Sequence, residues 1–354
     1  MRDPVRALAA RTLVLGIPGT TLDDTTRALL SEGPGGVILF RRNLRDAEQV
    51  IRLIASIRHA APSPLWISID QEGGRVARLR GIASDLPPMG HLDGPEAAAA
   101  AGRLLARELL ALGFDLDFAP VVDVLTNPDN PVIGDRAFGA TPEVVIERAL
   151  PFLEALQAGG VAACAKHFPG HGDTRLDSHR DLPRVEHDRQ RLEAVELPPF
   201  AAAIRAGVAT IMTAHVVLET IDPERPATLS PPVLSILRRD LGFDGLCPSD
   251  DLEMGAIARR LPIPEAAVQA LAAGVDQVLI CHSAGEQRAA LDALVDAVRT
   301  GRLSRARLEE AAARVEAALV RFPPDRPRPP FEGPRPFGPV AIPGPPGTDP
   351  TGDR

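Results

Sequence analysis

The chain has 354 residues, of which 45% are hydrophobic, and a formal net charge of −8. This composition is that of a globular protein with a sizeable core, and the negative charge argues against a nucleic-acid partner, because phosphate binding needs a basic surface. No apolar run approaches the length of a membrane span or of the apolar core of a signal peptide. The three cysteines, Cys164, Cys247 and Cys281, lie far apart within apolar runs, which favours buried reduced thiols. Together these features predict a cytoplasmic protein without a membrane partner.

Short apolar runs rich in β-branched residues alternate with amphipathic or alanine-rich stretches along most of the chain. The predicted strands are 12–16, 36–40, 65–69, 115–120, 161–165, 208–213, 243–250 and 275–281. The predicted helices between and after them are 23–31, 46–59, 94–112, 142–158, 192–206, 231–240, 264–273 and 285–300. This alternation indicates parallel strands joined by helical crossovers, and eight such units predict a (β/α)8 TIM-type barrel. A doubly wound open sheet is the alternative, but the GxGxxG motif typical of its first turn is missing.

The carboxy-terminal part of the sequence differs in composition from the rest. A last helix at 304–322 is expected to complete a catalytic barrel domain over residues 1–322. The stretch 322–354 holds 12 of the chain's 36 prolines, which predicts a disordered or polyproline-like extension at 323–354. We therefore expect that removing residues 326–354 changes the melting temperature and the activity little. The protein is also expected to be a monomer.

Ionisable residues follow six consecutive predicted strands. In chain order they are Asp70, Glu72, Arg75 and Arg78, then Asp135 and Arg136, then the stretch 166–183, then His215, then Asp250 and Asp251, and finally His282. The carboxyl ends of the strands carry the catalytic groups in barrels of this kind. The pattern therefore predicts an active site at this end of the barrel.

The stretch 166–183, KHFPGHGDTRLDSHRDLP, holds three of the chain's eight histidines together with three aspartates and a lysine. A glycosidase needs one carboxylate to attack or stabilise the anomeric centre and one proton donor for the leaving oxygen. Asp250, at the tip of the seventh strand, is placed to be the carboxylate. Asp177 and His179 could form a carboxylate–imidazole pair that donates the proton. Donor-rich side chains suited to sugar hydroxyls or a carbonyl are Arg78, Arg136, Lys166 and His167.

Other interpretations of these residues stay open at this point. A metal site could use His167, His171, Asp173 and His179, although the His-x-His usual after the first strand of metal-dependent barrel hydrolases is absent. Asp135 and Arg136 could form a structural ion pair, and Glu72 and Arg75 could support the site without contacting a ligand. Asp251 is expected to cap the following helix, and His282 to lie in the core or at the rim.

Several of these motifs match a known family. KHFPGHG, DSH, DQEGGRV, NPVIGDRAFG, MTAH and SDDLEM resemble those of family 3 glycoside hydrolases, and more narrowly the β-N-acetylglucosaminidases of the bacterial cell-wall recycling type. The resemblance extends over about residues 12–300. It implies a TIM barrel with Asp250 as nucleophile and His179 as general acid/base, partnered by Asp177. It also implies a set of sugar-binding residues, Asp70, Arg78, Arg136, Lys166 and His167.

The reaction implied by the resemblance is retaining hydrolysis of terminal β-linked N-acetylglucosamine, typically from 1,6-anhydromuramyl peptides, without a metal or other cofactor. Many family 3 β-glucosidases take their acid/base from a second domain, whereas the DSH loop is expected to supply it here from within the barrel. A β-glucosidase or a phosphorylase of the same family, a metallohydrolase and a non-catalytic sugar-binding barrel remain as alternatives. The sequence identifies neither the aglycone nor a role for the extension.

Overall fold

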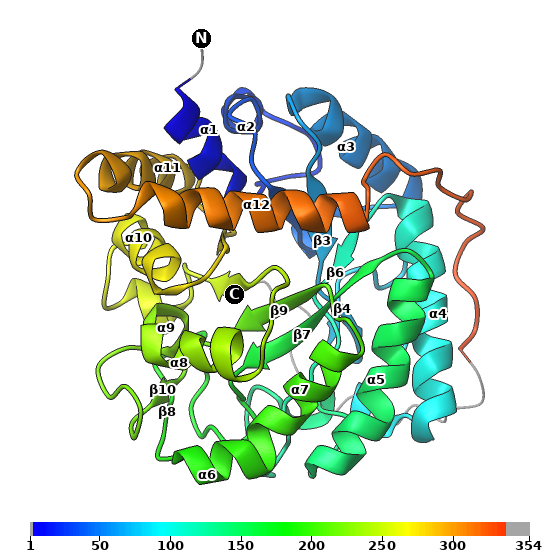
Figure 1. The fold of residues 1–354 in the computed structure, drawn as a ribbon. Helices are drawn as coiled ribbons and strands as arrows, with labels where there is room; N and C mark the ends of the chain where they lie inside the picture. Colours follow the sequence, from blue (N-terminus) through cyan, green and yellow to red (C-terminus); the bar gives the residue numbers. More distant parts are fainter. Residues whose placement is uncertain (1–2, 338–354) are drawn as a thin grey trace.

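A computed structural model describes residues 3–337 and is built around a closed barrel of eight parallel strands (Figure 1). The barrel strands are β1 (Leu13–Gly16), β2 (Gly36–Leu39), β3 (Trp66–Ile69), β6 (Leu116–Asp117), β7 (Ala162–Phe168), β9 (Thr210–Thr213), β11 (Pro248–Asp251) and β12 (Gln277–Ile280). They follow one another around the barrel in chain order, and β12 pairs with β1 to close it. Each predicted strand overlaps one of them, so the predicted (β/α)8 barrel is confirmed.

Helices surround the barrel at the predicted positions (Figure 1). They are α2 (Asp24–Leu30), α3 (Ala47–Ala60), α4 (Gly94–Leu112), α5 (Pro142–Ala158), α7 (Leu197–Arg205), α8 (Pro231–Ser235), α10 (Ile263–Ala273) and α11 (Ala284–Arg299). The short helices α6 (Arg189–Arg191) and α9 (Gly255–Ala258) lie in loops, and π-helical turns occupy Leu192–Glu196 and Ile236–Asp240. Two small sheets outside the barrel pair β4 (Gln71–Gly73) with β5 (Val76–Ala77) and β8 (Arg184–Val185) with β10 (Val217–Leu218).

Local sequence explains where the helices begin. Asp46 accepts a hydrogen bond from the backbone N–H of Gln49 at 2.8 Å and caps α3. Ser283 caps α11 in the same way, with 3.2 Å to the N–H of Glu286. Such side chains satisfy amide groups that lack a partner in the first turn. The buried faces of the helices then pack on the strands in one continuous apolar core.

Two helices lie outside the eight strand–helix units. Helix α1 (Pro4–Arg11) was not predicted, although Asp3 caps it through the N–H of Val5 and Pro4 fills its first position, a typical start signal. Helix α12 (Arg305–Arg321), predicted at 304–322, lies across the barrel in Figure 1. Its Val315 and Leu319 join the apolar cluster inside the barrel, so α12 closes the end at which the strands start.

Residues 323–337 contain no helix or strand, yet they lie against the barrel. The guanidinium of Arg328 donates hydrogen bonds to the carboxylate of buried Asp115 (2.6 Å) and to the carbonyl of Phe114 (3.0 Å). Phe331 and Phe337 pack, partly buried, on the main core. The predicted disorder therefore does not extend to residues 323–337, because arginines and phenylalanines between the prolines make these contacts, although eight of the fifteen residues are exposed. Residues 338–354 of the predicted extension lie outside the described residues.

The predicted character of the cysteines is confirmed, since Cys164, Cys247 and Cys281 are buried free thiols. Burial raises the pKa of Cys164 and of Cys247 to about 12. Within residues 3–337, no helix combines the length and the apolarity that crossing a bilayer requires.

Candidate active site

A pocket opens at the carboxyl ends of the barrel strands. It is lined by side chains that follow most of the strands, among them Phe40, Asp70, Glu72, Arg78, Arg136, Lys166, His167, His171, Ser178, His179, Asp250, Asp251, Glu253 and His282. Seven of the eight residues predicted for the site are in this set, and the eighth, Asp177, contacts one of them. The structure thus brings the predicted residues together at one place.

Asp250 lies near the end of β11, inside the pocket. Its Oδ1 accepts a hydrogen bond from the backbone N–H of Asp251 at 2.8 Å. Burial opposes ionisation of this carboxyl group, but the imidazoles of His215, His167 and His179 outweigh burial and hold its pKa below the ordinary value. Asp250 is therefore an ionised carboxylate at neutral pH, as a nucleophile must be.

Asp177 and His179 form the predicted carboxylate–imidazole pair on the loop after β7. The Oδ1 of Asp177 lies 2.8 Å from Nδ1 of His179 and accepts the backbone N–H of the same residue at 2.9 Å. A proton on Nδ1 therefore faces the carboxylate, and Nε2 is left for a ligand. The hydrogen bond from Asp177 is the main cause that raises the pKa of His179, and in return it lowers the pKa of Asp177 to about 2. The half-exposed imidazole thus keeps its proton to a higher pH than an ordinary histidine does.

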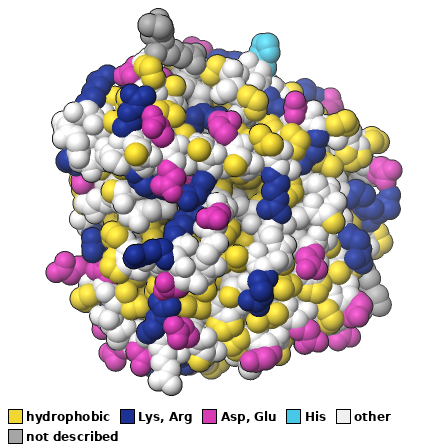
Figure 2. Space-filling view, viewed as in Figure 1, with side chains coloured by type: hydrophobic (Ala, Val, Ile, Leu, Met, Phe, Trp, Pro, Cys, Tyr) yellow, Lys and Arg dark blue, Asp and Glu magenta, His cyan; other side chains and the backbone are white. Residues whose placement is uncertain are grey.

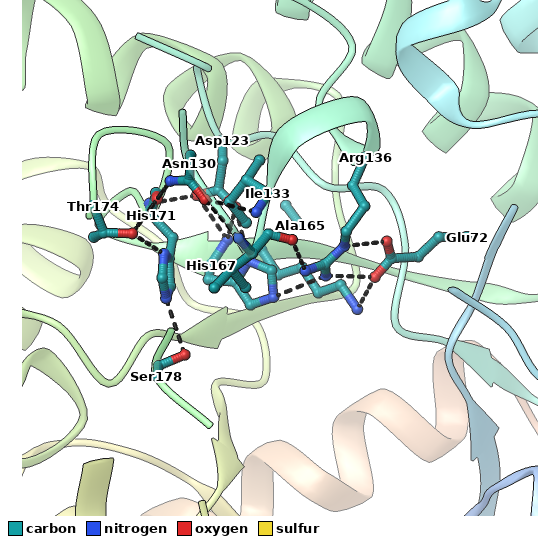
Figure 3. A network of polar contacts seen from close by, with 12 residues as sticks. Glu72, Asp123, Asn130, Ile133, Arg136, Ala165, His167, His171, Thr174 and Ser178 are labelled. Atoms are coloured by element: carbon teal, nitrogen blue, oxygen red, sulfur yellow. Dashed lines mark hydrogen bonds and ion pairs between the residues drawn. The ribbon is translucent and has the colours of Figure 1, made fainter. Parts of the chain in front are cut away.

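An ionic cluster of Asp70, Glu72, Arg136 and Lys166 lines another part of the pocket, and Figure 3 shows its Glu72–Arg136 pair. The Nζ of Lys166 lies 2.8 Å from Asp70 and 2.6 Å from Glu72. Arg136 binds Glu72 through two parallel hydrogen bonds of 2.8 Å. Burial alone would raise the pKa of Glu72, but Arg136 and Lys166 hold it well below its usual range. Glu72 thus supports two cations that the sequence predicted as sugar ligands.

Asp123 is one residue of this site that the sequence interpretation missed, and the pocket-lining Phe40 and Glu253 are two others. Asp123 is buried, its Oδ2 lies 2.7 Å from Nδ1 of His167, and its Oδ1 accepts the backbone N–H of His171 at 2.7 Å (Figure 3). The signal was a single aspartate within the apolar run APVVDVL, directly after the fourth predicted strand. A lone charge in such a run needs a partner, and here the partners come from the next strand.

Several neighbouring residues have structural roles. Arg75 does not line the pocket but binds Asp135 at 3.3 Å, so Asp135 pairs with Arg75 and Arg136 with Glu72 rather than with each other. Arg78 lies in the pocket, 3.9 Å from Asp70.

The prediction that Asp251 caps the following helix is wrong. This residue ends β11, and its Oδ1 accepts the backbone N–H groups of Glu253 (3.1 Å) and Cys281 (3.3 Å), while α9 starts only after Met254. His215 is buried between the hydroxyl of Thr228 and the carbonyl of Asp251.

His282 lies at the rim with a half-exposed side chain, which agrees with one of its two expected placements.

The four residues considered as metal ligands have separate partners. His167 is bound by Asp123, and Asp173 lies 2.8 Å from His187. The ring of His171 lies between two hydroxyl groups, those of Thr174 and Ser178. Among residues 3–337, no three His, Cys, Asp or Glu side chains gather as metal ligands do.

Comparisons with known proteins agree with this geometry. Residues 10–318 match the model of the glycosyl hydrolase family 3 N terminal domain. A β-hexosaminidase of Tolumonas auensis is 43% identical over 290 residues, which are 80% of this chain and 86% of the relative. A family 3 β-N-acetylglucosaminidase from Paenibacillus superposes with a TM-score of 0.90 at 41% identity, over 93% of this chain and 64% of the other. NagZ from Neisseria gonorrhoeae, solved in complex with N-trifluoroacetyl-D-glucosamine, superposes with a TM-score of 0.73 at 36% identity, over 87% of this chain and 97% of the other. The chain therefore belongs to glycoside hydrolase family 3 and is a glycoside hydrolase.

Proposed function

We propose that this protein is a retaining β-N-acetylglucosaminidase that forms a covalent glycosyl-enzyme on Asp250. The observation that carries the proposal is the presence, in one pocket, of an ionised carboxylate and a protonatable imidazole backed by its own carboxylate. These are the two groups that a retaining glycosidase needs. The relatives named β-hexosaminidase or β-N-acetylglucosaminidase support the choice of sugar.

In the first step the carboxylate of Asp250 attacks the anomeric carbon, and the bond to the leaving oxygen breaks. The Nε2 proton of His179 goes to that oxygen, so the aglycone leaves as a neutral alcohol. In the second step the neutral imidazole takes a proton from water, which attacks the anomeric carbon and releases Asp250 as a carboxylate. Asp177 keeps the ring oriented and stabilises its charged form in both steps.

The five proposed sugar-binding residues hold the non-reducing sugar while this happens. They are Asp70, Arg78, Arg136, Lys166 and His167, and all of them line the pocket. Ion pairs with Glu72 and Asp70 hold Arg136 and Lys166 in place, so little reorganisation is needed when hydroxyl groups bind.

For the aglycone we propose a peptidoglycan fragment of the 1,6-anhydromuramyl peptide type. The support is the motif resemblance to the cell-wall recycling enzymes. The N-acylated glucosamine bound by the Neisseria relative supports the choice of sugar and not that of the aglycone. A cytoplasmic location and a monomeric state stay predictions.

The test is an assay of the full chain on an aryl β-N-acetylglucosaminide beside the matching aryl β-glucoside, each with and without inorganic phosphate. We expect turnover of the first substrate at a much higher kcat/KM, with N-acetylglucosamine as product and no dependence on phosphate. Preference for the glucoside would indicate a β-glucosidase of the same family. A sugar phosphate as product would indicate a phosphorylase.

A further inference from the structure

A buried residue anchors the loop segment that carries the acid/base pair. Ser178 stands between Asp177 and His179 in the chain, and it is 2% exposed, whereas the His179 side chain is half exposed. The Oγ of Ser178 lies 3.0 Å from Nε2 of His171 (Figure 3). Asp177 and His179, the two side chains proposed for catalysis, thus flank a serine whose side chain points into the protein.

His171 is itself fixed to the barrel by three further contacts. Its backbone N–H donates to Asp123 at 2.7 Å, its carbonyl accepts from Nδ2 of Asn130 at 2.8 Å, and its Nδ1 lies 2.7 Å from the hydroxyl of Thr174 (Figure 3). Burial is the main cause that lowers the pKa of His171 to about 4. The neutral ring has one donor and one acceptor nitrogen, and a hydroxyl group can complement either.

A second contact to the same segment comes from the element that follows the nucleophile. The backbone N–H of Gly255 donates to the carbonyl of His179, and that of Ala256 to the carbonyl of Ser178, both at 3.1 Å. A Cβ at position 255 would lie 2.7 Å from the carbonyl oxygen of His179, so this close approach requires glycine. The chain that leaves β11 a few residues after Asp250 therefore reaches the backbone of the proton donor.

We propose that Ser178, His171 and Gly255 are positioning residues that dock the acid/base loop at a fixed place relative to Asp250. The proposal rests on the proposed role of His179 as proton donor. None of the three transfers a proton to the substrate; they act by holding His179 within hydrogen-bond reach of the leaving oxygen. Loss of this dock should therefore impair proton donation selectively, because small misplacements of a general acid cost rate.

The experiment compares kcat/KM on a nitrophenyl and on an alkyl β-N-acetylglucosaminide, since only the alkyl alcohol needs protonation to leave. Ser178→Ala should lower kcat/KM for the alkyl substrate about tenfold, the usual size of one lost buried hydrogen bond, and for the nitrophenyl substrate by less than about twofold. Gly255→Ala, which acts on the same segment through a different contact, should show the same selectivity. Arg175→Ala, an exposed position of the same loop, is the matched control and should change neither value.

Thermal melts of each variant set the assay temperature below its transition, so unfolding does not imitate the effect. The positioning role is disproved if Ser178→Ala and Gly255→Ala change kcat/KM equally for both substrates, or not at all, while His179→Ala lowers it selectively for the alkyl substrate. The proposed function stands in that case. If His179→Ala lowers kcat/KM equally for both substrates, His179 is not the proton donor, and the proposed positioning role of Ser178, His171 and Gly255 is wrong as well.

Discussion

At the scale of single residues, two adjacent aspartates illustrate how contacts assign different roles to the same side chain. Asp250 and Asp251 both end β11 and both line the pocket. The Oδ1 of Asp251 is held by two backbone N–H groups and its Oδ2 lies 3.3 Å from His282, so this carboxylate connects β11 to the loop after β12. Asp250 accepts one backbone N–H and lies among imidazoles. We therefore propose Asp250, and not Asp251, as the nucleophile.

We expect Asp250→Asn to lower kcat by roughly 10³–10⁶-fold, because an amide cannot form the glycosyl-enzyme, while the protein stays folded. Asp251→Asn keeps an oxygen that can accept the same N–H groups and should lower kcat by less than about tenfold. Steady-state kinetics on the nitrophenyl substrate, with circular dichroism to verify folding, measure both variants. Equal losses at the two positions would mean that the wrong aspartate is proposed as nucleophile.

The pair Asp177–His179 predicts the alkaline limb of the pH profile. For substrates with poor leaving groups, kcat/KM requires protonated His179, so it falls as pH rises through the pKa of His179, which Asp177 raises above the ordinary value. Asp177→Asn removes the carboxylate, lowers that pKa and should move the alkaline limb to lower pH. The acidic limb, where Asp250 becomes protonated, should stay below the usual range of an aspartate.

The control for this profile is Asp173→Asn, a carboxylate of the same loop that binds His187 instead. Its alkaline limb should coincide with that of the unchanged protein. An unshifted limb in Asp177→Asn would show that His179 is not the titrating acid.

At the scale of elements, the segment 323–337 shows that a stretch without secondary structure can be part of the fold. Its Arg328 donates a hydrogen bond to Asp115, a fully buried carboxylate that also accepts one from Arg58 at 2.7 Å. A buried charge that loses one of its partners keeps the cost of its desolvation. This segment should therefore contribute to stability although it is rich in proline.

We expect Arg328→Ala to lower the free energy of unfolding by about 1–3 kcal/mol, because Arg58 still compensates part of the charge of Asp115. Arg335→Ala removes an exposed arginine of the same segment that pairs with Glu332, and should change stability by less than about 0.5 kcal/mol. Urea denaturation of the full chain measures both. An Arg328→Ala variant as stable as the unchanged protein would show that residues 323–337 do not stabilise the barrel, as the sequence alone suggested.

At the scale of the whole molecule, the helix that closes the barrel and the pocket proposed as the active site lie at opposite ends of the strands. Helix α12 packs inside the start of the strands, whereas the pocket lies at their carboxyl ends. Closure between β1 and β12 depends on Gly16, since a Cβ there would lie 1.8 Å from the carbonyl oxygen of Cys281. On the face that carries α12, acidic and basic side chains are interspersed rather than gathered by sign (Figure 2). The changes proposed at Arg328 should therefore leave kcat untouched.

The sequence by itself determined the barrel, because eight apolar runs with helical stretches between them can bury both faces of their strands in few other ways. It also indicated at which strand ends the pocket lies, since ionisable residues that follow so many strands need a common site open to solvent. Local motifs placed Asp177 beside His179, because the two are only two residues apart.

Only the tertiary structure decided which charges neutralise one another. Glu72, which follows β3, meets Arg136 from the segment after β6 and Lys166 of β7. Asp123, also after β6, meets His167 of β7. Only the tertiary structure also showed the hydrogen bond between Ser178 and His171 and the backbone hydrogen bond from Gly255 to His179. It likewise showed that Arg328 binds Asp115 at the other end of the barrel. Such contacts join residues that are distant in sequence or fix the path of an irregular loop. Their free energy depends on burial and distance, which no local pattern of residues encodes.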